Sequence, residues 1–317
     1  FFKDNFVGLK YSILSLKSKN KFLAHEMLKI IAKDSDKNQL IEIHNRPYLV
    51  DKITKGNKFP ISSFFHNNPQ LMNGSKSIND RENILQKCAA VFCVSEYIKN
   101  LFLDGISFDN EKVHVLHNGV ERNTKNFPKK QKEILFVGRL VPEKGAHFYV
   151  KAVQVIANRY PKWRFGLIGS SRLGDNQYTS PYADRVIREF NNVGSQAKFY
   201  GFKNQEFVQK KMRNSSIIVI PSLWEEPFGL VAAEAMSNGM AIIASKVGGI
   251  PEIINEGGIL IEKINDLKLK NSLTDLINNK NKRMFFQKKA WENFDFSSIK
   301  SSKKLDDFRK TIYSDFF

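Results

Sequence analysis

The sequence predicts an α/β fold in which helices cover both faces of parallel sheets. Apolar runs of strand length alternate with segments of helical spacing along the 317 residues. The runs are continuous rather than alternating in polarity, which is typical of strands that are buried on both faces. Because strands and helices follow one another in turn, we expect a doubly wound arrangement.

The expected elements follow in chain order. Strands are predicted at 39–44, 59–66, 89–94, 112–117, 132–138, 163–169, 197–202, 216–222, 240–245 and 257–262. Helical spacing occurs at 16–33, 95–104, 145–159, 182–192, 204–213, 228–238, 266–279 and 297–313. A further short helix is expected to start at Pro251 and Glu252.

The segment ERNTKNFPKKQ (121–131) is the best candidate for a linker, since it is polar, contains Pro128 and has no periodicity. It separates the strands into two comparable sets. We therefore expect one domain at 1–125 and a second at 126–290. The tail, 291–317, reads as a kinked closing helix with Trp291 and Phe296 as apolar anchors.

The composition is that of a globular protein, with 42% hydrophobic and 26% charged residues. Lys and Arg number 50 against 32 Asp and Glu, a net charge of +18. This excess fits an anionic membrane surface, a phosphorylated substrate or nucleic acid, and it fits equally a coding sequence rich in A and T. Nucleic acid is disfavoured because no helix-turn-helix, zinc or RNA-binding motif appears.

The cysteines and the apolar runs indicate the cellular compartment and the relation of the chain to membranes. Cys88 and Cys93 have no second cysteine or histidine pair to complete a metal site, so we expect reduced core residues in a cytoplasmic protein. No run approaches the length of a membrane span, and no signal peptide opens the chain. Basic residues among apolar ones over 10–29 are compatible with docking on an anionic membrane, or equally with a solvated helix that covers the sheet.

Ligands of doubly wound sheets bind beyond the carboxyl ends of the strands, so we searched there for polar residues. The stretch VGRLVPEKG follows the strand at 132–138 and contains Gly138, Arg139 and Lys144. An arginine fork and a lysine point charge on one tight loop can converge on a diphosphate. The alternative is a pair of solvated surface residues.

The stretch PSLWEEPFGLVAAEA (221–235) follows the strand at 216–222. Pro227 suits the first position of a helix, and Gly229 would expose backbone N–H groups at the helix start to an anion. Glu226 and Glu234 are eight residues apart, about two helical turns, so both can face one cleft. Alternatively, Glu226 only stabilises the helix dipole and Glu234 is an exposed helix residue. Glu225 is expected to be a surface residue.

Three further strand ends carry glycine or histidine. In SKVGGIPEII, Gly248 and Gly249 indicate either a close backbone approach or only a tight turn. In EIHNRPYL and FFHNNPQLM, two histidines each follow a strand and precede an asparagine, a pattern that favours function over structure. The residues concerned are His44, Asn45, Arg46 and His66.

Together, GRLVPEKG, EEPFGLVAAEA and VGGIPEII resemble the family 4 retaining glycosyltransferases of the GT-B fold, with support from FCVSEYIKN, VLHNGV and FYGF. The resemblance implies two Rossmann-like domains that face one another across a cleft, and a metal-independent hexosyltransferase without a cofactor. Its donor would be a nucleotide-diphosphate sugar. Its acceptor would be a glycan or a lipid-linked molecule in cell-surface polysaccharide or lipopolysaccharide biosynthesis, at the cytoplasmic, inner face of the membrane.

The resemblance also implies roles for single residues. Arg139 and Lys144 would bind the diphosphate, Glu234 the ribose and Glu226 the transferred sugar. The catalytic set would be His66, Glu226, Arg139 and Lys144; the donor set would add Gly138, Phe202, Phe228, Gly229, Leu230, Val231 and Glu234; the acceptor side would hold His44, Asn45, Arg46 and His66.

Two features of the chain ends bear on this expectation. The tail would pack back on the first domain, as in the family. The family's initial strand and glycine-rich loop are missing, so we expect the sequence to lack its true start. A non-catalytic fragment or scaffold that binds sugar nucleotides is therefore the alternative function.

Overall fold

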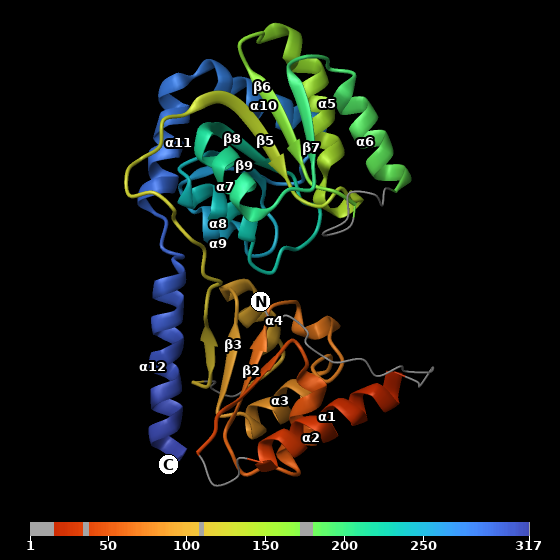
Figure 1. Cartoon of the computed structure of the whole chain (residues 1–317), viewed down its shortest axis with the longest axis vertical. Helices are drawn as coiled ribbons and strands as arrows, with labels where there is room; N and C mark the ends of the chain where they lie inside the picture. The colour runs from red at the N-terminus through yellow and green to blue at the C-terminus, as the bar shows by residue number, and fades with distance from the viewer. Residues whose placement is uncertain (1–15, 34–37, 108–110, 172–179, 317) are drawn as a thin grey trace. The chain divides into compact units, whose positions relative to one another are not determined.

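The structure is a computed structural model that describes residues 16–33, 38–107, 111–171 and 180–316 (Figure 1). Its contacts divide the chain into two compact units. Among the described residues, the first unit comprises those up to Phe92, 100–114 and 308–316. The second unit comprises the described residues of 93–99 and 115–307. Each unit is built around a sheet, and the predicted α/β class with parallel sheets is confirmed.

The sheet of the first unit has the order β1-β2-β3-β4. Strands β1 and β2 pair in parallel, with His44 opposite Phe64. The strands are β1 (Ile41–His44), β2 (Ile61–Phe65), β3 (Ala90–Cys93) and β4 (Val113–Val115). The helices are α1 (Leu16–Lys33), η1 (Pro47–Leu49), α2 (Val50–Thr54), η2 (Pro69–Leu71), α3 (Ile78–Lys87) and α4 (Glu96–Leu103), the last of which begins in the second unit.

The sheet of the second unit is wholly parallel and has the order β10-β9-β8-β5-β6-β7. The chain starts at β5, adds β6 and β7 on one side, and returns to place β8 on the other side. The strands are β5 (Gln131–Val137), β6 (Arg164–Ile168), β7 (Ala197–Gly201), β8 (Ser215–Ile220), β9 (Ala241–Ser245) and β10 (Gly258–Ile261). Strand order therefore reverses between β5 and β8, the position at which doubly wound sheets bind ligands.

Helices cover both faces of this sheet (Figure 1). Helices α5, α6 and α10 pack together on one face, and α7, α8 and α11 on the other. The bounds are η3 (Pro142–Lys144), α5 (Ala146–Ile156), η4 (Ala157–Arg159), α6 (Pro181–Asn191), α7 (Gln205–Asn214), α8 (Leu230–Ser237), α9 (Ile250–Ile254), α10 (Asp266–Asn278), α11 (Lys280–Glu292) and α12 (Ser298–Phe316).

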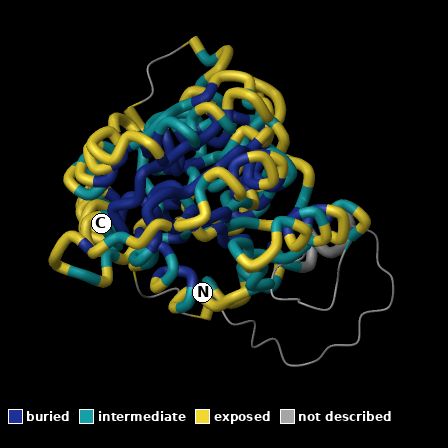
Figure 2. The backbone as a smooth tube through the Cα atoms, turned by 90° about the horizontal axis from the view of Figure 1, so that it is seen from above, coloured by how far each residue is buried: buried dark blue, intermediate teal, exposed yellow. Residues whose placement is uncertain are grey.

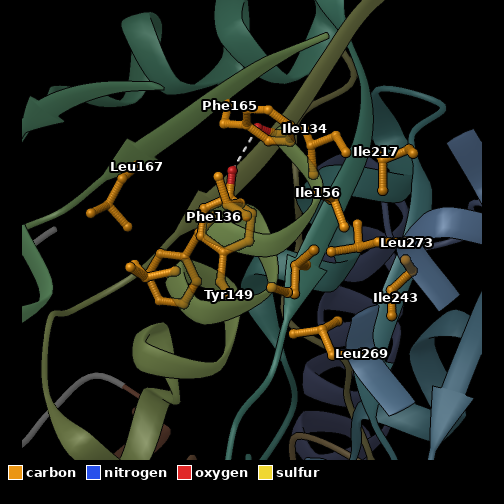
Figure 3. Packing of buried hydrophobic residues seen from close by; sticks show 14 of the residues in the cluster. Ile134, Phe136, Tyr149, Ile156, Phe165, Leu167, Ile217, Ile243, Leu269 and Leu273 are labelled. Atoms are coloured by element: carbon orange, nitrogen blue, oxygen red, sulfur yellow. Dashed lines mark hydrogen bonds between the residues drawn. The ribbon is translucent and has the colours of Figure 1, made fainter. Parts of the chain in front are cut away.

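The core of the second unit is built from aliphatic and aromatic residues of both its strands and its helices (Figure 3). Tyr149 is completely buried, and its hydroxyl donates to the carbonyls of Ile134, at 2.9 Å, and Gly166, at 3.2 Å. A buried hydroxyl without a partner would be costly, so these bonds allow tyrosine in an apolar core. The buried segments run through the interior and the exposed segments lie around them (Figure 2). The core thus fixes the strands whose ends carry the site.

All ten predicted strands are present among the described residues, but three of the described α-helices, α2, α3 and α11, were not predicted. Helix α3 begins with a capping box, in which Ser77 and Asp80 each bind the other's backbone N–H. The S-x-x-D signal was visible in the sequence. Helix α11 (KNKRMFFQKKAWE) is rich in charged residues and has no clear apolar face, so periodicity did not indicate it. The expected closing helix at 297–313 corresponds to α12, and residues 293–297 separate it from α11, which ends at Glu292.

Cys88 and Cys93 are buried and unpaired, as expected for core thiols. Burial raises the pKa of the Cys88 thiol to about 12 and that of Cys93 still further. Both side chains are therefore uncharged at neutral pH. None of the helices that the structure describes is long and apolar enough to cross a membrane.

Candidate functional site

A polar cluster lies beyond the carboxyl ends of β5 and β8, in the second unit. The Lys144 ammonium, from the loop after β5, pairs with the Glu226 carboxylate, from the loop after β8. Ser222 donates a hydrogen bond of 2.9 Å to the same Glu226 oxygen, Oε1. The side chains of Lys144 and Glu226 are 24% and 14% exposed, so both are partly shielded yet reachable from solvent. Ser222 was not among the predicted site residues, although it lies only two residues beyond the end of β8.

The two loops are locked together by backbone contacts. The Leu223 amide donates to the Glu143 carbonyl at 2.7 Å, and the Ser222 hydroxyl donates to the same oxygen at 3.2 Å. Gly145 has φ of +68°, and a Cβ there would lie 1.9 Å from the Pro221 carbonyl oxygen. Only glycine fits this contact, because a side chain would meet backbone that has no room to move. The loops that carry Lys144 and Glu226 are thus held at a fixed distance.

The glycine pair after β9 packs against the Glu226 loop. Gly248 has φ of +55°, and a Cβ there would lie 2.3 Å from the Glu226 carbonyl oxygen. A Cβ on Gly249 would lie 2.8 Å from the Pro227 carbonyl oxygen, and its amide donates to the Glu226 carbonyl at 2.7 Å. Of the two explanations considered from the sequence, a close backbone approach is the one found. The approaching backbone is the protein's own.

Glu225 has a structural role that the sequence analysis did not foresee. Its carboxylate accepts a hydrogen bond of 2.6 Å from the Gly248 amide. Glu225 is exposed, as expected of a surface residue, and this hydrogen bond gives it a structural role as well. Gly248 therefore contacts the loop after β8 twice, through the Glu225 side chain and through the Glu226 backbone.

The start of α8 differs from the prediction. We expected the helix to begin near Pro227, but it begins at Leu230 with Gly229 as the preceding residue. Gly229 has φ of +98°, a left-handed conformation through which a right-handed helix cannot run. Pro227 therefore lies in the loop. The expected two helical turns between Glu226 and Glu234 are replaced by a loop followed by a helix that includes only Glu234.

Glu234 lies in α8 and contacts α7 rather than the Lys144 cluster. Gln205, the first residue of α7, donates to Glu234 Oε1 at 2.6 Å. Burial raises the pKa of Glu234 above its ordinary value, and the Gln205 hydrogen bond offsets part of this effect. Nothing in the sequence pointed to Gln205, because the pairing depends on how α7 packs beside α8.

The remaining predicted donor residues lie around these loops. Arg139 is exposed, and among the described residues its side chain has no ion pair. Gly138 contacts the loop after β6, since a Cβ on Gly169 would lie 1.8 Å from the Gly138 carbonyl oxygen. Phe202 is half-buried directly after β7.

The residues around the start of α8 differ in how far they are exposed. Phe228 is 2% exposed, and its ring packs on that of Phe296 with centroids 5.7 Å apart, so its side chain belongs to the core. Leu230 is 50% exposed and Val231 is half-buried. A helix leaves its first N–H groups without intrahelical acceptors, so this end is suited to an anion.

The predicted acceptor residues lie together in the first unit, at the carboxyl ends of β1 and β2. His44 Nδ1 and His66 Nε2 are 3.0 Å apart. Asn45 has φ of +52°, and its side-chain oxygen accepts from the His66 amide at 2.8 Å. Arg46 is exposed at the start of η1. The two histidines that the sequence singled out are hydrogen-bonded to each other, which spacing alone could not reveal.

Two further expectations concern a metal ion and docking on a membrane. Within the described ranges, no group of three or more His, Cys, Asp or Glu side chains is placed to hold a metal ion. The basic and apolar residues suggested for membrane docking span 10–29, and the side chains before Leu23 lie outside the described residues.

Comparison with known proteins gives two family matches. Residues 117–292 match the family described as glycosyl transferases group 1, and residues 6–124 match the family described as glycosyltransferase family 4. The first match contains the Lys144 and Glu226 cluster, and the second contains the histidine pair. The two matches meet near the boundary between the two units.

Relatives and solved structures agree with these matches. An uncharacterized glycosyltransferase of Methanocaldococcus jannaschii is 32% identical over 227 residues, which cover 68% of this chain and 60% of that protein. A lipopolysaccharide 1,2-N-acetylglucosaminetransferase of Salmonella typhimurium is 26% identical over 171 residues, or 50% of this chain and 45% of that protein. The crystal structure of HepE from Anabaena in complex with UDP aligns with a TM-score of 0.71 at 19% identity, over 91% of this chain and 82% of that one.

Proposed function

The chain belongs to the glycosyl transferases group 1 family, and on this premise we propose that it transfers a sugar from a nucleotide-diphosphate sugar to a glycan or lipid-linked acceptor, with retention of configuration. The observation that carries the proposal is the cluster of Lys144, Ser222 and Glu226 at the reversal point of the parallel sheet. A cation, a carboxylate and a helix start there offer partners for both the phosphates and the sugar of one donor.

The phosphates would be bound by cations and backbone amides. The Lys144 ammonium has three N–H donors, so it can keep Glu226 and still bind a phosphate oxygen. Arg139 offers a planar fork from the same loop. The leaving nucleoside diphosphate gains negative charge as the glycosidic bond breaks, and fixed cations and the first amides of α8 would stabilise it. We propose that these groups supply this stabilisation without a metal ion.

The hydroxyl groups of the donor would be bound by carboxylates. Glu226 accepts hydrogen bonds from Lys144 and Ser222 at one oxygen, which leaves its second oxygen for the hydroxyls of the transferred sugar. Glu234 would accept from the ribose hydroxyls, and Phe202 would border the base. The same loops carry Gly138 and the amides of Phe228 to Val231, which we assign to donor binding as well.

The acceptor side is assigned to the first unit, with His66 at the reacting sugar and His44, Asn45 and Arg46 beside it. We retain the division into 1–125, 126–290 and 291–317 as a proposal. It is supported for the tail by the assignment of 308–317 to the first unit and by the ion pair of Arg309 with Glu42.

The acceptor class and the cellular site are the finer parts of the proposal. The Salmonella relative is named for lipopolysaccharide, which supports cell-surface polysaccharide or lipopolysaccharide biosynthesis at the inner face of the membrane. Binding to anionic vesicles that is lost in high salt would support peripheral association. Vesicles that fail to sediment the protein even at low salt would remove this part alone.

The proposal is tested first by binding and then by turnover. A thermal-shift screen against UDP-, GDP- and ADP-sugars should raise the Tm with one donor class, because a ligand of the folded state stabilises it. Turnover of that donor should then fall by roughly 10²-fold in Glu226→Gln. Glu262→Gln is the matched control, since it removes an exposed carboxylate of the same unit that pairs with Lys246.

The outcomes separate enzyme from binding protein. Donor binding together with turnover that chelators do not reduce supports a metal-independent transferase. Donor binding with equal turnover in the wild type and Glu226→Gln would favour the alternative, a non-catalytic protein or scaffold that binds sugar nucleotides. Binding of no nucleotide-sugar would refute both.

A further inference from the structure

Four titratable or charged side chains form a line in the first unit that extends beyond the residues assigned above. It runs from Arg309 in α12 to Glu42 in β1, then to His44 and to His66. Glu42 and His44 are two positions apart on one strand, so their side chains leave the same face of the sheet. Glu42 and Arg309 lie outside the proposed donor and acceptor residues and are joined by an ion pair.

Glu42 is held as a carboxylate by Arg309. The guanidinium donates from Nε to Oε1 and from Nη2 to Oε2, both at 2.8 Å. Partial burial would by itself raise the pKa of Glu42, but the neighbouring His44 and the hydrogen bonds and charge of Arg309 outweigh it and lower that pKa to about 2. A bidentate pair of this kind fixes orientation as well as charge. The carboxylate is therefore present and oriented throughout the neutral range.

The carboxylate lies beside one particular nitrogen of His44. Glu42 Oε2 is 3.9 Å from His44 Nε2, a distance at which the influence is electrostatic. The imidazole is stacked on Phe64, with ring centroids 4.1 Å apart and planes inclined by 12°, so its orientation is restricted. A negative charge next to Nε2 favours the proton on that nitrogen. The other nitrogen of neutral His44, Nδ1, is then a hydrogen-bond acceptor.

The position of the proton on His44 determines the position of the proton on His66, because the two rings share a hydrogen bond. In a neutral pair, one nitrogen must donate and the other accept across the 3.0 Å between His44 Nδ1 and His66 Nε2. If His44 Nδ1 accepts, His66 Nε2 carries the proton. The His66 backbone is also held, because its amide donates to the Asn45 side chain.

We propose that Glu42 is a positioning residue that acts through His44 to hold the proton of neutral His66 on Nε2, so that His66 Nδ1 accepts a hydrogen bond from a sugar hydroxyl. The substrate part of this inference rests on the proposed glycosyl transfer; the proton arrangement does not. Arg309 belongs to the same arrangement, since it fixes the carboxylate.

The proton arrangement is tested by NMR of the full chain with ¹⁵N-labelled histidine. The chain has 6 histidines, and His66→Gln identifies the signals of His66. In the wild type, the nitrogen shifts of His66 should be those of the Nε2–H form. In Glu42→Gln, the ratio of the two tautomers should move by about tenfold or more toward Nδ1–H, as expected when a charge of this kind is removed.

Two controls keep the result specific. Asp51→Asn removes another carboxylate of the first unit, one that is paired with Lys87, and should leave the His66 signals unchanged. His114 packs on Phe92 and Phe308 outside the line, and its signals should be the same in Glu42→Gln as in the wild type if the variant is folded.

Kinetics supply the second readout. Glu42→Gln should lower kcat by roughly 10-fold, the effect of losing one hydrogen bond to the reacting sugar, while the KM for the donor stays within about twofold. Unequal effects are expected because the donor loops belong to the other unit. A His66 tautomer that Glu42→Gln does not change, or that is Nδ1–H in the wild type, overturns the proposal whatever happens to kcat. Absence of transfer in the wild type would instead refute the proposed function and leave the NMR test intact.

Discussion

Gly248→Ala is expected to damage stability and activity together, because Gly248 meets two separate constraints. Its φ of +55° is a left-handed conformation that costs a residue with a Cβ about 1–2 kcal/mol. The new Cβ would also lie 2.3 Å from the Glu226 carbonyl oxygen, whereas ordinary contacts begin near 3.4 Å. The loop must therefore shift by roughly 1 Å, at a further cost of about 1–3 kcal/mol.

The shift should also appear in turnover. A displacement of about 1 Å at a reacting group costs on the order of 10²-fold in rate. Gly194→Ala is a matched control, since Gly194 has φ of +89° but nothing within 4 Å of its Cβ position. It pays the backbone cost alone and should retain full activity.

The assay compares thermal unfolding and kcat/KM of the two alanine variants. At about 2–4 °C per kcal/mol, Gly248→Ala should melt at least about 2 °C below Gly194→Ala. Equal Tm values and equal kcat/KM for the two variants would show that the close approach to Glu226 has no energetic or functional consequence, which would refute the reasoning.

Three further predictions follow from other contacts. Lys144→Ala should lower kcat/KM for the donor by roughly 10²-fold, and steady-state kinetics in which it behaves like the wild type would remove Lys144 from the site. Glu42 has a depressed pKa of about 2, so its contribution to stability is present above pH 4.5 and lost as the pH falls; urea unfolding should show about 2 kcal/mol of this loss between pH 6 and 3, absent in Glu42→Gln. Lys130 donates to three backbone carbonyls, so Lys130→Met should cost about 3 kcal/mol in urea unfolding, and a cost under about 1 kcal/mol would contradict a structural role.

The strands could be predicted from the sequence because buried parallel strands are continuous apolar runs, and each run here ends within a few residues of the observed strand. Helix α8 shows why the ends of helices were harder to predict than the positions of strands. Pro227 looked like a first helical residue, yet the left-handed φ of Gly229 moves the start to Leu230. A glycine in a sequence indicates conformational freedom, but the sequence alone does not show whether the fold uses it for a turn, a helix end or a close backbone contact.

The site was predictable where residues follow strands and not where they meet by packing. His44 and His66 were found as separate strand ends, and Lys144 and Glu226 as separate loops. Their pairing depends on strand order, which places β1 beside β2 and β5 beside β8. Arg309 and Glu42 are 267 positions apart in the chain, and no local pattern connects them.

The glycine contacts described above have a consequence for exchanging parts between related proteins. Gly145 meets Pro221, Gly169 meets Gly138, and Gly248 meets Glu226, each at distances that admit no side chain. Four loops therefore form one mechanical assembly, in which each is shaped by the backbone of another. A chimera that imports a single loop to change donor preference should misfit its neighbours, whereas transfer of all four as a cassette preserves every contact.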